Sequence, residues 1–180
     1  SFFTSNPGNT AGMLPLALPK RSVTVIHDVT FLPHPDWYSW RDERLQKIAL
    51  ARARQASTVI VPSDYTRDEM IHHAHFSADK IHVVPLAPDP EYKPGPTDQS
   101  VLKKYGVGES YIIYVGRLDA KKNVEIIIKA HSHILNLSAG KAGNMRMKDL
   151  QLVLVGAPGF GWKKIAQAIK SSPHGSCIKV

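Results

Sequence analysis

The segment Tyr111-Ile-Ile-Tyr-Val-Gly-Arg-Leu-Asp-Ala-Lys-Lys-Asn123 contains the change of pattern that decides the fold. Its first five residues are apolar or aromatic without polar alternation, which predicts a strand buried in a parallel sheet. Gly116 then permits a tight turn, and Asn123 is suited to cap a helix that we expect to run to about Leu137. The segment therefore predicts a strand, a loop and a helix, with the loop at the carboxyl end of a parallel strand.

The same alternation of apolar runs and helical segments continues on both sides of this unit. We expect strands at residues 22–26, 58–61, 81–84, 150–155 and 178–180. We expect helices at residues 37–56, 63–75, 97–105 and 162–170, with Ser63 and Gly106 as caps. Residues 1–21 are rich in proline and glycine and predict irregular chain, and residues 138–149 predict a polar loop. Strands that alternate with helices favour an α/β fold with mostly parallel sheets.

A proline-rich segment from Pro85 to Pro96 divides this pattern in two. Neither a central strand nor a helix interior tolerates prolines at this density, so we interpret the segment as a linker. We expect one α/β half at residues 1–88, a linker with a helix at 89–108, and a second half at 109–180. Each half has the parallel-sheet pattern of a Rossmann-like domain and is too short to complete one.

Composition excludes several protein classes. Of the 180 residues, 43% are hydrophobic and 21% charged, which excludes a wholly disordered chain, a collagen and a coiled coil. The single cysteine, Cys177, excludes an internal disulfide framework and favours a reducing compartment. No apolar run approaches the ~20 residues of a bilayer span, no signal peptide is visible, and a first residue other than Met suggests a partial chain. We expect a cytoplasmic protein, and a place at the inner face of a membrane stays open.

The formal net charge of +8 predicts an anionic partner, which is nucleic acid, an acidic membrane surface or phosphate groups. Arg117 and Lys122 give the phosphate hypothesis a location, because both lie between a strand end and the positive N-terminus of a helix. Arginine binds phosphate bidentately and lysine binds it as a mobile point charge, so the pair is suited to neutralise a diphosphate leaving group. The alternative is that Arg117, Lys121 and Lys122 are ordinary solvated charges.

A second glycine-rich turn, from Val155 to Trp162, also follows a strand and precedes a helix. Its spacing differs from the dinucleotide fingerprint, and Pro158 lacks an N–H that a phosphate cradle would use. The turn therefore predicts either a wall beside a base or sugar or a plain loop. His27, at the end of the first expected strand, is a candidate acid, base or hydrogen-bond donor, although structural histidines are commoner. The other histidines lack the spacing of a metal site, so we expect no bound metal.

Aromatic and basic residues gather between Trp37 and Arg54, which raises two hypotheses for that helix. The first is contact with nucleic acid or an anionic membrane surface. The second, which we favour, is a helix packed on the core with a basic outer rim, because the cations spread around the helix instead of forming one stripe. Peripheral contact with anionic lipid stays open.

Five blocks of the sequence resemble glycosyltransferase family 4, in the order found in that family. The blocks are Val25–Trp37, Val59–Arg67, Val83–Asp89, Tyr114–Asn123 and Leu152–Gly156. The resemblance covers residues 22 to 170 and implies a retaining enzyme of the GT-B fold, which has two Rossmann-like domains. The pair His27-Asp28, followed by His34-Pro35 and by the turn Gly161-Trp162, is most similar to members that use GDP-mannose or related donors.

The resemblance implies a hexosyltransferase that moves a hexose, with mannose favoured, from a nucleoside-diphosphate sugar to a glycan or lipid-linked acceptor. It implies that Arg117 and Lys122 hold the donor diphosphate, and that His27, the catalytic candidate, lines the cleft near the transferred sugar or the acceptor. The implied neighbours of the donor nucleotide are Gly116, Gly156, Gly161 and Trp162. It also implies that the enzyme is metal-independent, has no cofactor besides its sugar-nucleotide substrate, with GDP-mannose favoured, and binds no nucleic acid.

The family's amino-terminal glycine-rich loop and carboxyl-terminal acidic E-x7-E motif would lie upstream of Ser1 and downstream of Val180. We therefore interpret the chain as a central fragment of a GT-B enzyme and expect the 180 residues alone to lack transferase activity. One alternative is a non-catalytic, basic α/β module that binds nucleic acid or an anionic membrane surface. Another is a sugar-nucleotide epimerase or phosphorylase of similar topology, and the lack of a dinucleotide fingerprint argues against the epimerase.

Overall fold

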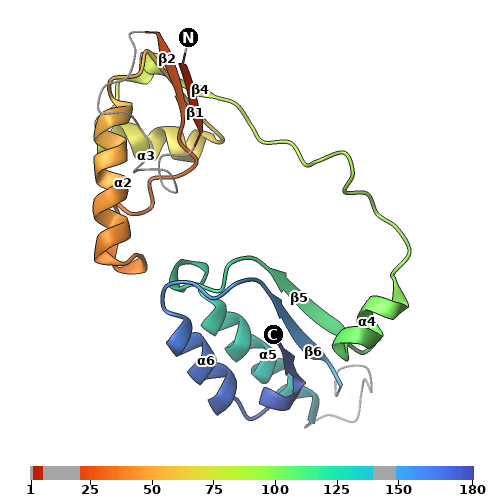
Figure 1. The fold of residues 1–180 in the computed structure, drawn as a ribbon. Helices are drawn as coiled ribbons and strands as arrows, with labels where there is room; N and C mark the ends of the chain where they lie inside the picture. The colour runs from red at the N-terminus through yellow and green to blue at the C-terminus, as the bar shows by residue number, and fades with distance from the viewer. Residues whose placement is uncertain (1, 6–20, 140–148) are drawn as a thin grey trace. The chain divides into compact units, whose positions relative to one another are not determined.

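The computed structural model describes residues 2–5, 21–139 and 149–180 of the chain. The chain forms two compact units, Ser1–Lys93 and Pro94–Val180, whose boundary lies inside the proline-rich segment (Figure 1). Both units consist of a parallel sheet with helices, as the alternating sequence pattern predicts. We call them the first and the second unit and describe each by itself.

The first unit has a four-stranded parallel sheet in the order β1-β2-β3-β4. Its strands are β1 (Phe2–Ser5), β2 (Ser22–Val25), β3 (Thr58–Val61) and β4 (Ile81–Val83). Its helices are α2 (Trp40–Ala53) and α3 (Asp64–Ala74), with the short 3-10 helices η1 (Pro35–Trp37) and η2 (Ala78–Lys80). Consecutive strands are neighbours, so each helical connection crosses from one strand to the next.

The prediction of irregular chain over residues 1–21 is wrong for Phe2–Ser5, which form β1. This segment precedes the first proline and contains two phenylalanines and a threonine, residue types that favour strands. Its backbone pairs in parallel with β2, in a register that joins Phe2 to Ser22 and Ser5 to Val25. The strand therefore depends on a partner distant in sequence. Residues 6–20 lie outside the described part of the chain.

Serine caps fix where the two helices of the first unit begin. The Ser63 hydroxyl accepts a hydrogen bond from the Thr66 backbone N–H at 3.2 Å, which confirms Ser63 as the N-cap of α3. The Ser39 hydroxyl accepts from the Asp42 N–H at 3.1 Å, so α2 begins at Trp40, three residues later than expected. Both helices bury small or apolar residues against the sheet, and the largest buried side chains there include Ile26, Val59, Val61 and Met70.

The carboxyl end of α3 is held by Arg54, the residue that caps the end of α2. The Arg54 guanidinium donates hydrogen bonds to the backbone carbonyls of Ala74 and His75, and lies 5.0 Å from the ring centre of Phe76. His75 itself adopts the left-handed conformation, with φ of 50°. The last carbonyls of a helix have no partner within the helix, so Arg54 supplies one and joins the ends of α2 and α3.

The second unit has a three-stranded parallel sheet in the order β5-β6-β7. Its strands are β5 (Tyr111–Val115), β6 (Gln151–Val155) and β7 (Ile178–Lys179). Its helices are α4 (Gln99–Tyr105), α5 (Val124–Ala139) and α6 (Trp162–Ser171), with the 3-10 helices η3 (Ala120–Lys122) and η5 (Gly175–Cys177). Gly106 follows α4 with φ of 63°, which confirms it as the cap of that helix.

The prediction that β5 is a buried strand is wrong. Ile113 is exposed and Val115 is 73% exposed, whereas Leu152 and Leu154 of β6 are buried. The strands follow one another in sheet order, so right-handed crossovers place α5 and α6 on the same face, where they pack together (Figure 1). The outward side chains of β5 are therefore exposed within the second unit.

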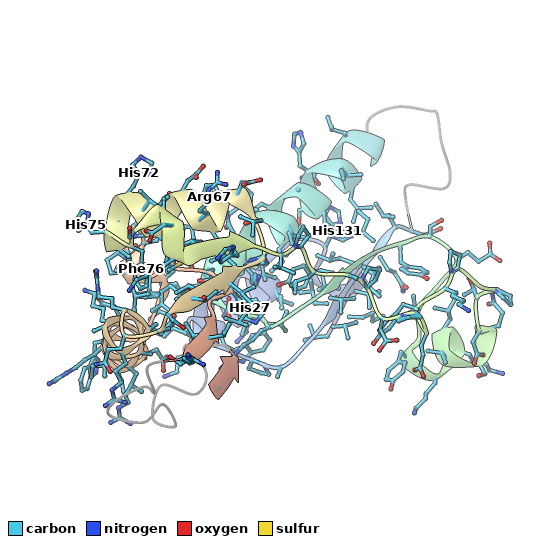
Figure 2. The ribbon with its side chains drawn as sticks, turned by 90° about the horizontal axis from the view of Figure 1, so that it is seen from above. His27, Arg67, His72, His75, Phe76 and His131 are labelled. Carbon is cyan, nitrogen blue, oxygen red and sulfur yellow. The ribbon has the colours of Figure 1, made fainter. Side chains whose placement is uncertain are left out.

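Helix α5 is longer than expected, because it reaches Ala139 and includes the start of the predicted loop; residues 140–148 of that loop lie outside the described chain. Its buried His131, which is labelled in Figure 2, donates a hydrogen bond from Nε2 to the Leu150 carbonyl at 2.8 Å. This bond joins α5 to the residue that precedes β6. In the described parts of the chain, no helix has both the length and the apolar character that crossing a membrane requires.

Candidate functional site

Two loops lie side by side at the carboxyl edge of the second unit's sheet. They are the β5–α5 loop, residues 116–123, and the β6–α6 loop, residues 156–161. Four backbone hydrogen bonds continue the pairing of β5 with β6 into the loops: Gly116 N–H to Val155, Leu118 N–H to Ala157, Gly159 N–H to Leu118 and Ala120 N–H to Phe160, at 2.8–3.0 Å. The loops are therefore an extension of the sheet, and their side chains have defined positions.

Glycines of the β6–α6 loop permit this close approach. A Cβ atom on Gly159 would lie 2.6 Å from the Cβ of Asp119 and 2.9 Å from Nε of Arg117. A Cβ on Gly161 would lie 3.0 Å from the Cβ of Ala120, and Gly161 has φ of 83°, in the left-handed region. The sequence predicts that this turn is either a wall beside a base or sugar or a plain loop. In the structure the turn packs directly against the β5–α5 loop.

Arg117 lies across Gly159 with its side chain exposed. The backbone of Arg117 is held in place because the Tyr114 hydroxyl donates a hydrogen bond to the Arg117 carbonyl at 3.1 Å. Burial raises the pKa of Tyr114, and the nearby charge of Asp119 raises it further. The tyrosine therefore stays protonated over the physiological range and remains a donor to this carbonyl.

Asp119 is a site residue that the sequence did not reveal. Its side chain is 7% exposed, and Oδ1 has no hydrogen-bond partner among the described residues. A buried oxygen without a partner is costly, so it marks a place where a further donor would be stabilising. Nothing in the sequence distinguishes Asp119 from a solvated loop aspartate, because its burial results from contact with Gly159 in the other loop.

Lys122 is exposed at the end of η3, where its backbone N–H donates to the Asp119 carbonyl at 3.1 Å. Asn123 follows in the left-handed conformation, and its carbonyl accepts from the Ile126 N–H at 3.0 Å in the first turn of α5. Three cations and one carboxylate give the β5–α5 loop an excess of positive charge beside a helix N-terminus. Anions are favoured at such a place.

The structure brings together six of the seven residues proposed from sequence. Those in the β5–α5 loop are Gly116, Arg117 and Lys122, and those in or next to the β6–α6 loop are Gly156, Gly161 and Trp162. Trp162 begins α6 and its half-buried ring packs against the core cluster around Leu154 and Ile165, so it supports the loop from inside. The seventh residue, His27, belongs to the first unit.

His27 follows β2 at the carboxyl edge of the first unit's sheet (Figure 2). Its ring is half-buried, and its backbone carbonyl accepts a hydrogen bond from the Thr66 hydroxyl at 3.3 Å. Thr66 lies in the first turn of α3, so this bond fixes the chain after β2 against the start of that helix. Within the described residues no three His, Cys, Asp or Glu side chains are grouped as a metal site would need.

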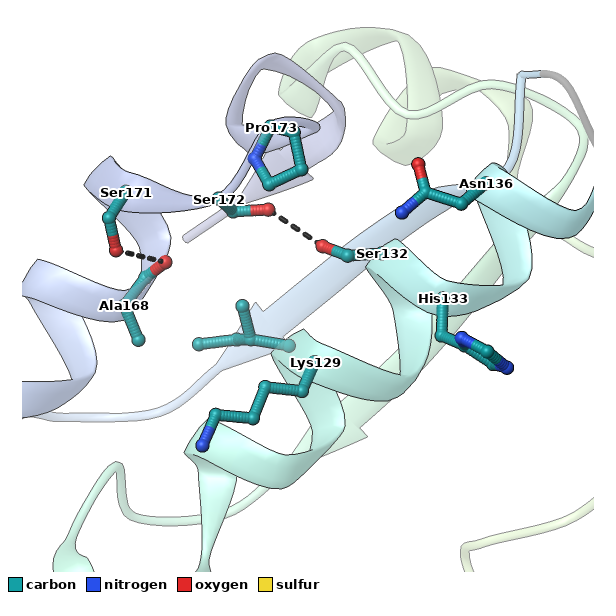
Figure 3. A pocket seen from close by; sticks show the side chains of 9 residues that line it. Lys129, Ser132, His133, Asn136, Ala168, Ser171, Ser172 and Pro173 are labelled. Atoms are coloured by element: carbon teal, nitrogen blue, oxygen red, sulfur yellow. Dashed lines mark hydrogen bonds between the residues drawn. The ribbon is translucent and has the colours of Figure 1, made fainter. Parts of the chain in front are cut away.

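A groove of about 390 Å³ lies between α5 and α6, away from these loops (Figure 3). Apolar groups line most of it, including Ile128 and Ala168. The hydroxyls of Ser132 and Ser172 bond to each other at 2.8 Å, and the Ser171 hydroxyl donates to the Gln167 carbonyl at 2.8 Å. Because these hydroxyls already have partners, the groove is less suited to a polar ligand than the two loops are.

The sequence profile of Glycosyltransferase Family 4 matches residues 3–92, which is half of the chain. The chain belongs to glycosyltransferase family 4. The matched part is the first unit, which contains His27, so the family assignment is independent of the loops of the second unit.

Two curated relatives agree with family 4 membership. The chain is 27% identical over 116 residues to O-antigen chain mannosyltransferase B of Escherichia coli, an alignment that covers 62% of the chain and 30% of the relative. It is 29% identical over 107 residues to α-D-kanosaminyltransferase of Streptomyces kanamyceticus, covering 57% of the chain and 25% of that relative. The aligned part thus spans less than a third of either relative.

Solved structures show that the fold is shared with GT-B glycosyltransferases. A mutant of S. aureus TarM, in complex with fondaparinux, α-GlcNAc-glycerol and UDP, matches with a TM-score of 0.56 at 13% identity, over 88% of this chain and 27% of TarM. An E. coli trehalose-6-phosphate structure with bound UDP-2-fluoro glucose matches with a TM-score of 0.51 at 15% identity, over 92% of this chain and 46% of that one. At these identities the similarity concerns the fold alone, and the family 4 chain has the Rossmann-like halves that its sequence predicts.

Proposed function

We propose that the protein transfers a sugar from a nucleoside-diphosphate donor, and that the second unit holds the donor's diphosphate at its two paired loops. The observation that carries this proposal is the position of Arg117, whose side chain lies across Gly159 where the loops are hydrogen-bonded together. A cation is thus held beside glycine backbone at the carboxyl ends of two parallel strands, which is where open α/β sheets bind ligands.

Each residue of the loops has a separate task in this proposal. The Arg117 guanidinium binds two phosphate oxygens, and the Lys122 ammonium neutralises charge from the other end of the loop. As the bond from the sugar to the diphosphate breaks, negative charge grows on the leaving oxygen, and fixed cations stabilise it. The two side chains supply positive charge that a divalent cation could otherwise supply to a diphosphate. We therefore propose that the transfer is metal-independent and needs no cofactor.

The identity of the sugar is a finer proposal. We propose a hexose, with mannose from GDP-mannose favoured, an acceptor that is a glycan or lipid-linked, and retention of the anomeric configuration. The mannosyltransferase relative supports mannose, and the kanosaminyltransferase relative makes another sugar an alternative. The structures that contain UDP or a UDP-sugar make uridine donors the alternative nucleotide to test. We assign His27 to the transferred sugar or the acceptor, since its half-buried ring follows a strand at the carboxyl edge of the first sheet.

Calorimetric titration of the purified protein with GDP and with UDP tests the diphosphate site. We expect one nucleoside diphosphate to bind, and the double variant Arg117→Ala/Lys122→Ala to weaken binding by about 100-fold, because two charge-assisted contacts are lost. EDTA should leave binding unchanged. The matched control is Lys103→Ala/Lys104→Ala on α4, which removes the same charge outside the loops and should retain binding.

Two results would contradict the proposal. Unchanged affinity in the Arg117→Ala/Lys122→Ala variant would show that the diphosphate does not bind at these loops. Binding of nucleic acid that falls steeply with salt and resists competition by free GDP would favour the non-catalytic alternative. Tighter binding of UDP than of GDP would make a uridine nucleotide the donor, and the assignment of the diphosphate to these loops would stay unchanged.

A further inference from the structure

Helix α2 exposes apolar side chains together with arginines on one face. Trp40 is 70% exposed, Leu45 is 40% exposed and Ile48 is 38% exposed. We define the outer face of α2 by these three residues together with the exposed arginines Arg41 and Arg44. The opposite side of the helix buries Ala49, Leu50 and Ala53 in the core of the first unit, so the exposed residues are not needed to hold the helix in place.

Helical spacing turns these residues into two adjacent rows. Trp40, Arg44 and Ile48 are four residues apart and form one row, and Arg41 and Leu45 form the next. The sequence favours a helix packed on the core with a basic outer rim, and the structure places Arg41 and Arg44 on the solvent side of α2 together with the apolar residues.

The acidic residues of α2 lie outside these rows and are already engaged. The Ser39 hydroxyl donates to the Asp42 carboxylate at 2.7 Å, at the N-terminus of the helix. Glu43 forms an ion pair with Lys47 at 2.6 Å. In the described parts of the chain, no ion pair joins Arg41 or Arg44 to a carboxylate, and the Arg41 guanidinium lies 5.7 Å from the ring centre of Trp40. The outer face therefore carries uncompensated positive charge.

We propose that the outer face of α2 docks the protein on the surface of an anionic lipid bilayer. Arginines in this position bind lipid phosphates, and an adjacent tryptophan is stabilised at the boundary between headgroups and acyl chains. Because the other side of α2 is packed on the sheet, only the outer side chains enter the headgroup region, and α2 lies flat on the bilayer. This proposal does not rest on the diphosphate site, which is in the other unit.

The mixture of residues favours lipid over nucleic acid. Binding to nucleic acid depends on cations against phosphates and on aromatic rings that stack on bases. Arg41, Arg44 and Trp40 would suit either partner, but the aliphatic Leu45 and Ile48 gain only from an apolar environment. A bilayer provides both anionic headgroups and an apolar interior, so its chemistry matches all five residues of the outer face.

Co-sedimentation with lipid vesicles tests the docking surface. We expect the protein to bind vesicles of phosphatidylcholine with about a third of phosphatidylglycerol, to bind vesicles of phosphatidylcholine alone far less, and to dissociate as salt rises. Tryptophan emission should shift to shorter wavelength on the anionic vesicles. The variant Trp40→Phe should lose that shift, because Trp37 stacks on His34 and Trp162 packs in the core.

Variants of exposed residues distinguish the contribution of the outer face to vesicle binding from that of the net charge. Arg41→Gln/Arg44→Gln should weaken vesicle binding about fivefold for each arginine removed, and Trp40→Ser should weaken it as well. The matched control Lys103→Gln/Lys104→Gln removes two charges from α4 and should change binding by less than a factor of about two. Circular dichroism and thermal midpoints should match the parent protein, because these positions on α2 do not contribute to the core.

Four outcomes would overturn the proposal. The first is no binding to anionic vesicles, and the second is an equal loss in the α4 control, which would make net charge the cause. The third is tighter binding to duplex or single-stranded nucleic acid than to vesicles, without a tryptophan shift. The fourth is a dimer in light scattering that Trp40→Ser abolishes, together with no vesicle binding, which would make the outer face a contact between two copies of the chain.

Discussion

A Cβ atom on Gly156 would lie 1.9 Å from the carbonyl oxygen of Gly116. The Gly116 N–H donates to the Val155 carbonyl at 2.9 Å, so the backbones of the two loops meet where β5 and β6 end. No side chain fits between them. This contact sets the path of the β5–α5 loop and therefore the starting point of Arg117.

The first prediction concerns this contact. Gly156→Ala should destabilise the second unit by about 2 kcal/mol or more, because the methyl group must displace backbone and not a flexible side chain. The control is Gly95→Ala, which places a Cβ in open space and should leave stability unchanged. Urea unfolding followed by circular dichroism measures both. Equal stability of the two variants would show that the loops are not packed as described.

Elements set by local sequence were predictable, while features set by distant contacts were not. Ser63 and Gly106 were identified as caps, since capping depends on residues within one helical turn. The strand β1 was missed because it depends on pairing with β2, some twenty residues further along the chain. The burial of β5 was overestimated because strand order and the side taken by α5 and α6 decide it.

The candidate site shows the same division. Arg117 and Lys122 could be proposed from the sequence because they follow a strand end, which is visible there. The buried Asp119 was not found, because its environment is made by Gly159 from a loop forty residues away. Trp162 was placed correctly at the start of α6, but the contact of its ring with the core depends on how the helices pack.

The second prediction is a pH dependence carried by Tyr114. Its pKa is raised in the folded protein, first by burial and then by the charge of Asp119, so folding favours the protonated phenol. The stabilisation is complete below the ordinary tyrosine pKa of about 10 and is lost as pH rises through the raised value. Titration of phenolate absorbance, compared with Tyr114→Phe, should show one late-titrating tyrosine. Asp119→Asn should lower the pKa of Tyr114 without restoring the ordinary value, and an unchanged late titration would contradict this coupling.

The third prediction concerns the contact of Arg54, at the end of α2, with the carboxyl end of α3. Arg54→Ala should destabilise the first unit by about 1–3 kcal/mol, because the carbonyls of Ala74 and His75 lose a charged donor and Phe76 loses its cation. Arg54→Lys should restore only part of this, since an ammonium lacks the planar fork that reaches two carbonyls. Arg44→Ala, on the exposed side of the same helix, serves as the control in thermal unfolding. A loss as large in Arg44→Ala would attribute the effect to charge or helix propensity.

The fourth prediction links loop packing to the proposed diphosphate site. In Gly159→Ala the new methyl group would meet Nε of Arg117 at 2.9 Å and the Cβ of Asp119 at 2.6 Å, so the guanidinium must move although its charge is retained. Nucleoside diphosphate binding should weaken about tenfold, the value of one misplaced charge-assisted contact. In an Arg117→Ala background the same glycine change should weaken binding by much less than tenfold, because the guanidinium that it displaces is absent and only the contact with Asp119 remains. Gly108→Ala, whose Cβ would meet only the Gln151 side chain at 3.7 Å, controls for glycine replacement elsewhere in the unit. Calorimetry on the four proteins completes the cycle, and additive losses would show that Gly159 acts on the ligand by a route other than Arg117.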